Sequence, residues 1–368
     1  MTTKMVNELI RDNDIMETGY APSTGGRRPQ MYSLRPDRMY TLAVAMDQLF
    51  TRIVIMDMQR QPVTAAEKFE LHLAKNPRAL ETLAEKIDEH IHRSGIKKDR
   101  LAGIGIGMPG FVDSRNGINY SFMGAGERSV SQYIMERVGV RTYIENDSSL
   151  IALAELSFGA AYHKKSAMVI NLSWGIGLGL ILNGELFRGG NGFAGEFSHL
   201  PLFSNNKLCS CGKSGCLETE ASLLVMVEKA KEGIAGGRVT MLTQQQLADN
   251  PDQASLAVIS AAGKGDKFAV ELLSESGYNI GRGVAILIHL LNPETIVLGG
   301  RGAAAGKIWQ TAIQQALNEH CIPRLSANTT IEVSELGLDA ELIGAAALVM
   351  ENYVKGSIKK GASAVMAR

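Results

Sequence analysis

Apolar residues recur along the chain with two different periods. Residues 40–58, YTLAVAMDQLFTRIVIMDM, alternate and then run apolar, which predicts two strands joined by a tight turn. Residues 77–93 have the helical period and predict an amphipathic helix. Its core-facing stripe would be Leu80, Leu83, Ile87 and Ile91.

Further apolar runs end in glycine-containing or polar loops. LAGIGIGMPGFVD predicts a buried strand ending at Pro109-Gly110, and RTYIENDSSLIALAELSFG a strand and a helix with Asn146 and Asp147 at their junction. SAMVINLSWGIGLGLILNGELF predicts two strands and a hairpin turn at Asn183-Gly184. GRGVAILIHLLNPETIVLGGRG predicts a buried helix, a stop and a strand. Two lobes that each open with a strand–turn–strand indicate a duplicated α/β architecture.

Composition agrees with an ordinary globular protein of several domains. The 368 residues suggest two or three domains, with 45% hydrophobic and 21% charged residues. The net charge is zero, so no protein-wide field favours nucleic acid or a membrane. The N-terminus lacks an apolar signal core, and the longest apolar runs, Val284–Leu291 and Ile343–Met350, are too short to span a bilayer. We therefore expect a cytoplasmic protein without a membrane partner.

The first 37 residues have their own pattern. An amphipathic helix through Val6, Leu9 and Ile10 precedes a short strand at residues 15–17, a basic glycine loop and a second strand at residues 30–34. This order is that of the back half of a winged helix-turn-helix, starting at its recognition helix, so the first two helices are expected to be missing and DNA binding to be weak. The expected DNA contacts are Thr2, Thr3, Lys4, Arg27 and Arg28. A basic interdomain linker is the alternative.

Three of the four cysteines crowd into one loop, C-x-C-G-x-x-G-C, ten residues after a histidine. Gly212 and Gly215 allow tight turns that aim the thiolates inward. A soft tetrahedral ion takes four nitrogen or sulfur ligands, which predicts a structural zinc ion with no open position. Its ligands would be His199, Cys209, Cys211 and Cys216. The alternative is three buried or redox-active thiols with His199 packed nearby.

The segment GEFSHLPL…CSCGKSGCLE resembles the signature of the ROK family, which groups bacterial sugar repressors with sugar kinases. Other matching pieces follow in order along nearly all the chain. The resemblance implies a two-lobed actin/hexokinase/RNase H-like fold. Repressors of this family also carry a winged helix-turn-helix that ends in a wing similar to STGGRRP, and the chain is similar to the branch that regulates N-acetylglucosamine and xylose operons.

The resemblance also implies a set of sugar-contacting residues, all of the expected type: Gly110, Asn146, Asp147, Glu196, His199 and Glu218. In the kinases the residue that matches Asp147 is the base that deprotonates a sugar hydroxyl. A carboxylate suits that role, but it would equally accept a hydrogen bond in a pure binding site. The alternative is that Asn146 and Asp147 merely cap a helix.

Two loops depart from the kinase pattern. Where the kinases have D-I-G-G-T, this chain has VAMDQLFT: in one register Ala45 replaces the aspartate and Asp47 and Gln48 replace the glycines. A shifted register keeps Asp47 and Thr51 but places Leu49 and Phe50 at the glycine positions. The second loop, T-G-I-G in the kinases, reads SWGIG with Trp174. ATP binding is therefore not expected, and Asp147 would be a vestigial base.

The sequence thus predicts a transcriptional repressor of carbohydrate genes without enzyme activity. A sugar or sugar phosphate bound between the lobes would control operator binding by a homodimer or homotetramer. The expected domains are 1–37 (partial winged helix), 38–157 (first lobe, joined by a C-terminal helix near 341–356) and 158–340 (second lobe with the zinc loop). A sugar kinase and a repressor controlled by a protein partner are the alternatives.

Overall fold

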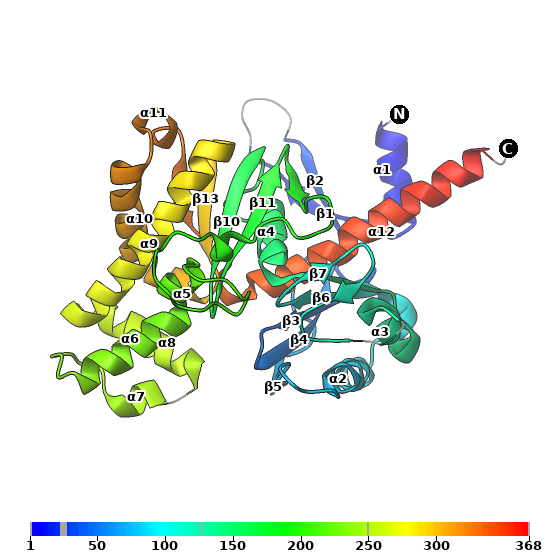
Figure 1. Cartoon of the computed structure of the whole chain (residues 1–368). Helices are drawn as coiled ribbons and strands as arrows, with labels where there is room; N and C mark the ends of the chain where they lie inside the picture. Colours follow the sequence, from blue (N-terminus) through cyan, green and yellow to red (C-terminus); the bar gives the residue numbers. More distant parts are fainter. Residues whose placement is uncertain (1, 23–27, 125, 127, 249, 367–368) are drawn as a thin grey trace. The chain divides into compact units, whose positions relative to one another are not determined.

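The apolar pattern of the chain resolves into two units, each with its own sheet. A computed structural model describes residues 2–22, 28–124, 126, 128–248 and 250–366. Unit 1 comprises Met1–Asp147 and Ala345–Arg368, and unit 2 comprises Ser148–Gly344 (Figure 1). The boundary expected between 157 and 158 lies at the far end of helix α4 (Asp147–Phe158). Nearly all of this helix falls in unit 2, because its first turns pack on glycines of the unit-2 sheet.

Unit 1 contains a five-stranded sheet of order β5-β4-β3-β6-β9. The predicted strand pair is present as β3 (Tyr40–Met46) and antiparallel β4 (Phe50–Asp57). β6 (Leu101–Met108) runs parallel to β3, and β9 (Thr142–Asn146) runs parallel to β6. Ligands of α/β sheets bind beyond the carboxyl ends of parallel strands, so the loops after β3, β6 and β9 are where a ligand of unit 1 is expected.

Smaller elements complete unit 1. The predicted amphipathic helix is α2 (Ala79–Ser94), and its stripe of Leu80, Leu83, Ile87 and Ile91 is buried, as predicted. The other elements are β5 (Glu67–Glu70), η1 (Lys98–Arg100), β7 (Val112–Asp113), β8 (Ile118–Asn119) and α3 (Val130–Val138). β7 and β8 pair as a small antiparallel hairpin directly after the loop of Gly110.

The N-terminal segment is a helix followed by a two-stranded antiparallel hairpin. It contains α1 (Thr2–Arg11), β1 (Ile15–Tyr20) and β2 (Gln30–Leu34), so the first strand is longer than predicted. The segment is tied to the chain after it, because Arg35 Nη1 donates to Asn13 Oδ1 at 2.9 Å and Arg38 pairs with Asp14 at 2.6 Å. The winged helix-turn-helix remains a prediction.

Unit 2 repeats the arrangement around a sheet of order β12-β11-β10-β13-β14. Its strands are β10 (Ser166–Leu172), β11 (Ile176–Leu182), β12 (Glu185–Phe187), β13 (Thr295–Gly299) and β14 (Thr330–Val333). An antiparallel pair, β10–β11, again lies beside a parallel strand, β13. Asn183 and Gly184 form the predicted hairpin turn, with φ of 57° and 76°. The predicted duplication is confirmed.

The helices of unit 2 pack closely enough to require glycine. Gly277 and Gly281 of α9 face α10, and a Cβ added at Gly281 would lie 2.6 Å from Ala316 Cβ. Figure 1 shows α9 and α10 side by side. The helices and 3₁₀ turns are η2 (Phe197–His199), α5 (Glu218–Ala221), α6 (Leu223–Ala235), α7 (Gln244–Ala248), α8 (Pro251–Gly263), α9 (Lys267–Leu291), η3 (Arg301–Ala305), α10 (Gly306–His320), α11 (Pro323–Ser326) and η4 (Gly337–Asp339).

The C-terminal helix α12 (Ala340–Met366) begins in unit 2 and continues in unit 1. A Cβ at Gly344 would lie 2.0 Å from the carbonyl oxygen of Leu150, and a Cβ at Gly105 would lie 2.0 Å from that of Ala345. The backbone of α12 therefore packs directly against the backbone of α4 in unit 2 and of β6 in unit 1. Within the described chain, no helix has both the length and the apolar character needed to cross a membrane.

Candidate functional site

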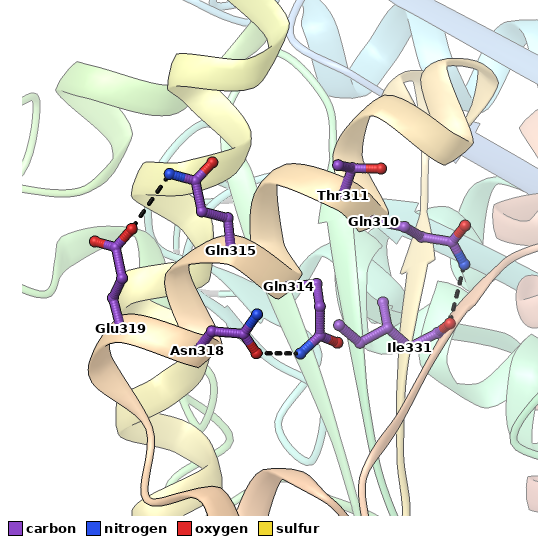
Figure 2. Close-up of a pocket in the computed structure, with 7 residues that line it drawn as sticks. All are labelled: Gln310, Thr311, Gln314, Gln315, Asn318, Glu319 and Ile331. Carbon is purple, nitrogen blue, oxygen red and sulfur yellow. Dashed lines mark hydrogen bonds between the residues drawn. The ribbon is translucent and has the colours of Figure 1, made fainter.

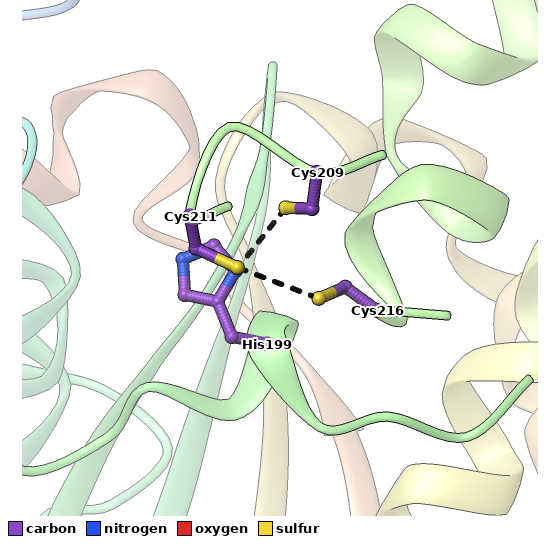
Figure 3. A group of neighbouring side chains, drawn as sticks. All are labelled: His199, Cys209, Cys211 and Cys216. Carbon is purple, nitrogen blue, oxygen red and sulfur yellow. Dashed lines mark hydrogen bonds between the residues drawn. The ribbon is translucent and has the colours of Figure 1, made fainter. Parts of the chain in front are cut away.

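The histidine and three cysteines of the sequence motif converge in unit 2 (Figure 3). Their ligand atoms all lie within 4.8 Å of one another. Cys209 Sγ is 3.5 Å from His199 Nδ1, and Cys211 Sγ is 3.6 Å from Cys216 Sγ. The spacing of the motif therefore predicted a real cluster.

Tight turns hold this loop in shape. Leu208 pairs with Ser214 in an isolated bridge, and Cys209 N–H donates to the carbonyl of Lys213 at 2.8 Å. Gly215 has a φ of 77°, and a Cβ there would lie 2.0 Å from the carbonyl oxygen of Phe203. Glycine is required at this position for both reasons.

The donor set fits a soft cation. The cysteines are free thiols, and burial raises the pKa of Cys216 to about 12. Such a thiol stays protonated at neutral pH unless a cation stabilises its thiolate. One imidazole and three sulfurs make a four-coordinate set, so the cluster could hold a metal ion.

The two nitrogens of His199 face different partners. Nδ1 faces Cys209 Sγ, whereas Nε2 lies 3.7 Å from Glu196 Oε2. Histidines that bind a metal through one nitrogen usually donate the other N–H to a carboxylate or carbonyl. A metal ion on Nδ1 would therefore leave Nε2 protonated and pointed at Glu196. This gives the dual assignment of His199 to the metal and the sugar a geometric basis.

Of the other predicted sugar residues of unit 2, Glu196 lies beside this histidine and Glu218 lies near Glu196. Glu196 precedes η2 and Glu218 begins α5. Partial burial raises the pKa of Glu196, the nearby His199 opposes that shift, and the charge of Glu218 adds to it. A Cβ at Gly175 would lie 2.6 Å from Glu218 Oε2, so Glu218 adjoins the SWGIG turn.

The residues predicted in unit 1 also come together. Gly110 follows β6 with a φ of 86°, Asn146 ends β9, and Asp147 begins α4. Asn146 Nδ2 donates to the carbonyl oxygen of Gly110 at 3.2 Å. The six predicted residues thus form two groups of three, one in each unit.

Sequence reasoning missed the residues that anchor the metal loop. Glu220 of α5 accepts a hydrogen bond from Asn205 at 2.7 Å, and its carboxylate pairs with Lys207 at 2.9 Å. Arg282 of α9 donates to the carbonyl of Leu202, and its guanidinium lies 4.9 Å from the ring centroid of Phe203. These contacts follow no recognisable sequence motif, so the sequence does not signal them.

The turn between β3 and β4 is closed by its own carboxylate. The backbone N–H groups of Leu49 and Phe50 each donate to Asp47 Oδ1 at 2.7 Å, and Asp47 N–H donates to the carbonyl of Phe50 at 2.9 Å. In an open turn, N–H groups such as these could bind an anion. Here the N–H groups of Leu49 and Phe50 bind the carboxylate of Asp47.

The SWGIG turn of unit 2 is also filled. Trp174 is 7% exposed, and the guanidinium of Arg301 lies 4.8 Å from the centroid of its ring system. Arg301 in turn forms an ion pair with Asp252 of α8. The side chains of Trp174, Arg301 and Asp252 thus form a connected group beside the SWGIG turn.

The residues expected to bind DNA are described only in part. Arg27 and the side chain of Thr2 lie outside the described residues. Thr3 and Lys4 are exposed on α1, and Arg28 is exposed ahead of β2.

A pocket of about 770 Å³ lies over the polar face of α10 beside β14 (Figure 2). Its lining is Gln310, Thr311, Gln314, Gln315, Asn318, Glu319 and Ile331. The amides bond locally: Gln314 donates to Asn318, and Gln310 donates to the carbonyl of Ile331 at 3.0 Å. No predicted site residue lines this pocket.

Comparison with known proteins places these features in context. The model of the ROK family matches residues 51–352. A glucokinase of Halalkalibacterium halodurans is 33% identical over 286 residues, which cover 76% of this chain and 84% of that protein. The N-acetylglucosamine repressor of Escherichia coli O6:H1 is 29% identical over 356 residues, 96% of this chain and 86% of the repressor.

Among solved structures, a ROK family transcriptional regulator described as a homologue of the Escherichia coli MLC protein superposes with a TM-score of 0.78. It is 25% identical, and the match covers 95% of this chain and 88% of that one.

Proposed function

The chain belongs to the ROK family, and from that premise we propose that it is a sugar-responsive transcriptional repressor of carbohydrate genes that does not phosphorylate its effector. Similarity to a named repressor over 96% of the chain supports regulation. The glucokinase match, over 76% of the chain, makes a kinase the second candidate.

A single observation favours the repressor over the kinase. Phosphoryl transfer in a glycine loop needs backbone N–H groups that are free to approach phosphate oxygens. In this chain the N–H groups of Leu49 and Phe50 already bond to the carboxylate of Asp47. A phosphate approaching this turn would meet a negative charge instead of N–H donors. The closed turn supports loss of kinase activity.

The sugar contacts are retained. Gly110, Asn146 and Asp147 in unit 1 and Glu196, His199 and Glu218 in unit 2 supply acceptors and donors suited to hydroxyl groups. We propose that these residues contact a sugar or sugar-phosphate effector. An effector that binds one conformation of the chain more tightly than another would change their populations, which is the thermodynamic basis of its regulatory effect.

The His199 cluster is assigned a structural zinc ion. Four protein ligands would fill its tetrahedral coordination, so the ion would stabilise the loop and take no part in chemistry. By holding His199 through Nδ1, it would fix the orientation of the ring toward Glu196. Metal binding and effector binding would then be coupled through one imidazole.

The N-terminal segment is assigned to operator DNA. Its exposed Lys4 and Arg28 suit phosphate contacts, and a homodimer would present two such segments to two half-sites.

The test is a fluorescence anisotropy titration of DNA fragments that the protein selects in vitro, with and without D-xylose, N-acetyl-D-glucosamine and its 6-phosphate. We expect sequence-specific binding that weakens as salt rises and that falls by about tenfold or more with one of these sugars, a coupling of about 1.4 kcal/mol. Specific DNA binding that none of the three changes would contradict control by these effectors.

A further inference from the structure

Beyond the predicted sugar contacts, a buried asparagine supports the loop of Gly110. Asn119 ends the short hairpin strand β8 and is 3% exposed. It pairs across the hairpin with Val112, which is 1% exposed. The inner face of the hairpin therefore places an amide group in the interior, where each of its polar atoms needs a partner.

Both ends of the Asn119 amide are used. Nδ2 donates to the carbonyl oxygen of Pro109 at 3.1 Å, and Oδ1 accepts from the N–H groups of Ser121 and Phe122 at 2.9 and 3.1 Å. One side chain thus joins the start of the 109–111 loop to the segment that follows β8.

Ser121 also holds the 109–111 loop, through a hydrogen bond to Phe111. Its Oγ accepts from the N–H of Phe111 at 2.9 Å. A Cβ added at Gly110 would lie 2.5 Å from both Cβ and Oγ of Ser121, so the loop lies directly against this residue. The loop is therefore fixed at Pro109, Gly110 and Phe111 in turn.

The 109–111 loop is also bonded to Asn146, a predicted sugar contact. The carbonyl oxygen of Gly110 accepts from Asn146 Nδ2. This bond directs Nδ2 of Asn146 toward Gly110, so the position of the carbonyl bears on how the amide is turned.

We propose that Asn119 is a positioning residue for effector binding: it fixes the 109–111 loop and, through the carbonyl of Gly110, the amide of Asn146. This role rests on the proposed function, in which Gly110 and Asn146 contact the sugar. Its effect on affinity is indirect and passes through the loop.

The experiment compares Asn119→Ala and Ser121→Ala with the control Asn116→Ala in the full chain. Asn116 lies in the turn of the same hairpin, and its side chain bonds to Asp113, away from the loop. Calorimetry measures the affinity for D-xylose, N-acetyl-D-glucosamine and its 6-phosphate, and hydrogen exchange follows the peptide that contains Phe111. Thermal denaturation of each variant identifies a general loss of stability.

For Asn119→Ala we expect exchange at Phe111 to rise and the dissociation constant for the bound sugar to increase about tenfold, measured well below the unfolding transition. Ser121→Ala should raise exchange at Phe111 and weaken binding less, because the bonds of Asn119 remain. Asn116→Ala should match the wild type in both. A purely structural role would lower the melting temperature and leave the dissociation constant unchanged.

The outcomes separate this role from the proposed function. If the wild type binds a sugar and Asn119→Ala binds it within twofold as tightly, the positioning role is wrong and the proposed function stands. If the wild type binds none of the three sugars, their proposed role as effectors fails, and the positioning role fails with it.

Discussion

At the residue scale, His199 links the two chemical features of unit 2. Its Nδ1 faces the sulfur cluster and its Nε2 faces Glu196. In the proposed function, one edge of this ring binds the metal ion and the other lies beside the sugar. A change at the metal should therefore alter sugar binding.

Cys211→Ser tests this link. Loss of one thiolate should lower the zinc content from about one ion per chain, loosen the loop and weaken sugar binding at the same time. Elemental analysis and calorimetry on gently purified protein measure both effects. Cys321→Ser is the matched control, since Cys321 is buried outside the cluster. Wild-type protein without stoichiometric metal would contradict the assignment.

Glu196→Ala tests the carboxylate beside His199. Removal of a hydrogen-bonding group from a sugar site costs about 1–3 kcal/mol, so the affinity should fall by about tenfold or more. Glu228→Ala, an exposed glutamate of α6, should leave it unchanged. Calorimetry that gives equal affinities for wild type and Glu196→Ala would remove Glu196 from the site.

Spacing predicts residues that form a recognisable motif and misses contacts that have no such motif. The cluster of His199, Cys209, Cys211 and Cys216 spans 18 residues, and its spacing was enough to predict it. Asn119, Glu220 and Arg282 have no such signal. Arg282 meets Leu202 from 80 residues away, and that proximity depends on how α9 packs.

At the element scale, the strongly apolar segments were predictable, whereas two short edge strands were not. β3, β4, β6, β10 and β13 are apolar runs within sheets, and the sequence predicted each. β5, with the sequence EKFE, and β14, with the sequence TIEV, lie at sheet edges, and at least half of their few residues are polar. Their strand conformation depends on a neighbouring strand, which local sequence does not reveal.

Helix packing in unit 2 depends on glycine. Gly281→Ala would place a methyl group 2.6 Å from Ala316 Cβ and 2.9 Å from the backbone of Ile313, and overpacking of this kind costs about 1–3 kcal/mol. Gly263→Ala in α8 meets nothing within 4 Å and should change stability by no more than about 1 kcal/mol, in the stabilising direction. Urea denaturation of both variants measures the contrast. Equal midpoints would show that α9 and α10 adjust to the extra methyl group.

A buried carboxyl joins α4 to the end of β14. Glu155 is fully buried and accepts hydrogen bonds from the hydroxyl of Ser334 and from Ala160 N–H. Burial raises its pKa above the ordinary value of 4.5; these hydrogen bonds oppose the shift, and the nearby charges of Glu332 and Glu335 add to it.

Because the folded state holds this proton more tightly than the unfolded state, the contribution of Glu155 to stability is greatest below pH 4.5. It falls as pH rises toward the raised folded-state pKa and is constant above it. Glu155→Gln cannot titrate, so its stability relative to wild type should increase over that range. Melting temperatures from pH 4.5 to 8 measure the difference, with exposed Glu185→Gln as control. A difference independent of pH would show that Glu155 does not titrate there.

At the scale of the whole molecule, the proposed function combines a retained sugar site with turns that no longer accept phosphate. The predicted sugar residues keep their polar groups in both units, whereas Asp47 closes the turn in unit 1 and Trp174 with Arg301 fills the corresponding turn in unit 2. The sequence showed that glycines were missing from the first turn. It did not show that Asp47 bonds to the backbone of its own turn or that Arg301 covers Trp174, because both depend on the folded geometry.

The central claim is that this protein binds a sugar without phosphorylating it, and calorimetry of one sugar titration with and without Mg-ATP tests it most directly. We predict a saturable heat of binding with the same dissociation constant in both titrations, and no continuing heat once the sugar is bound. A steady heat output that requires both the sugar and ATP, at a turnover near the usual kinase range of about 1–100 per second, would contradict the account.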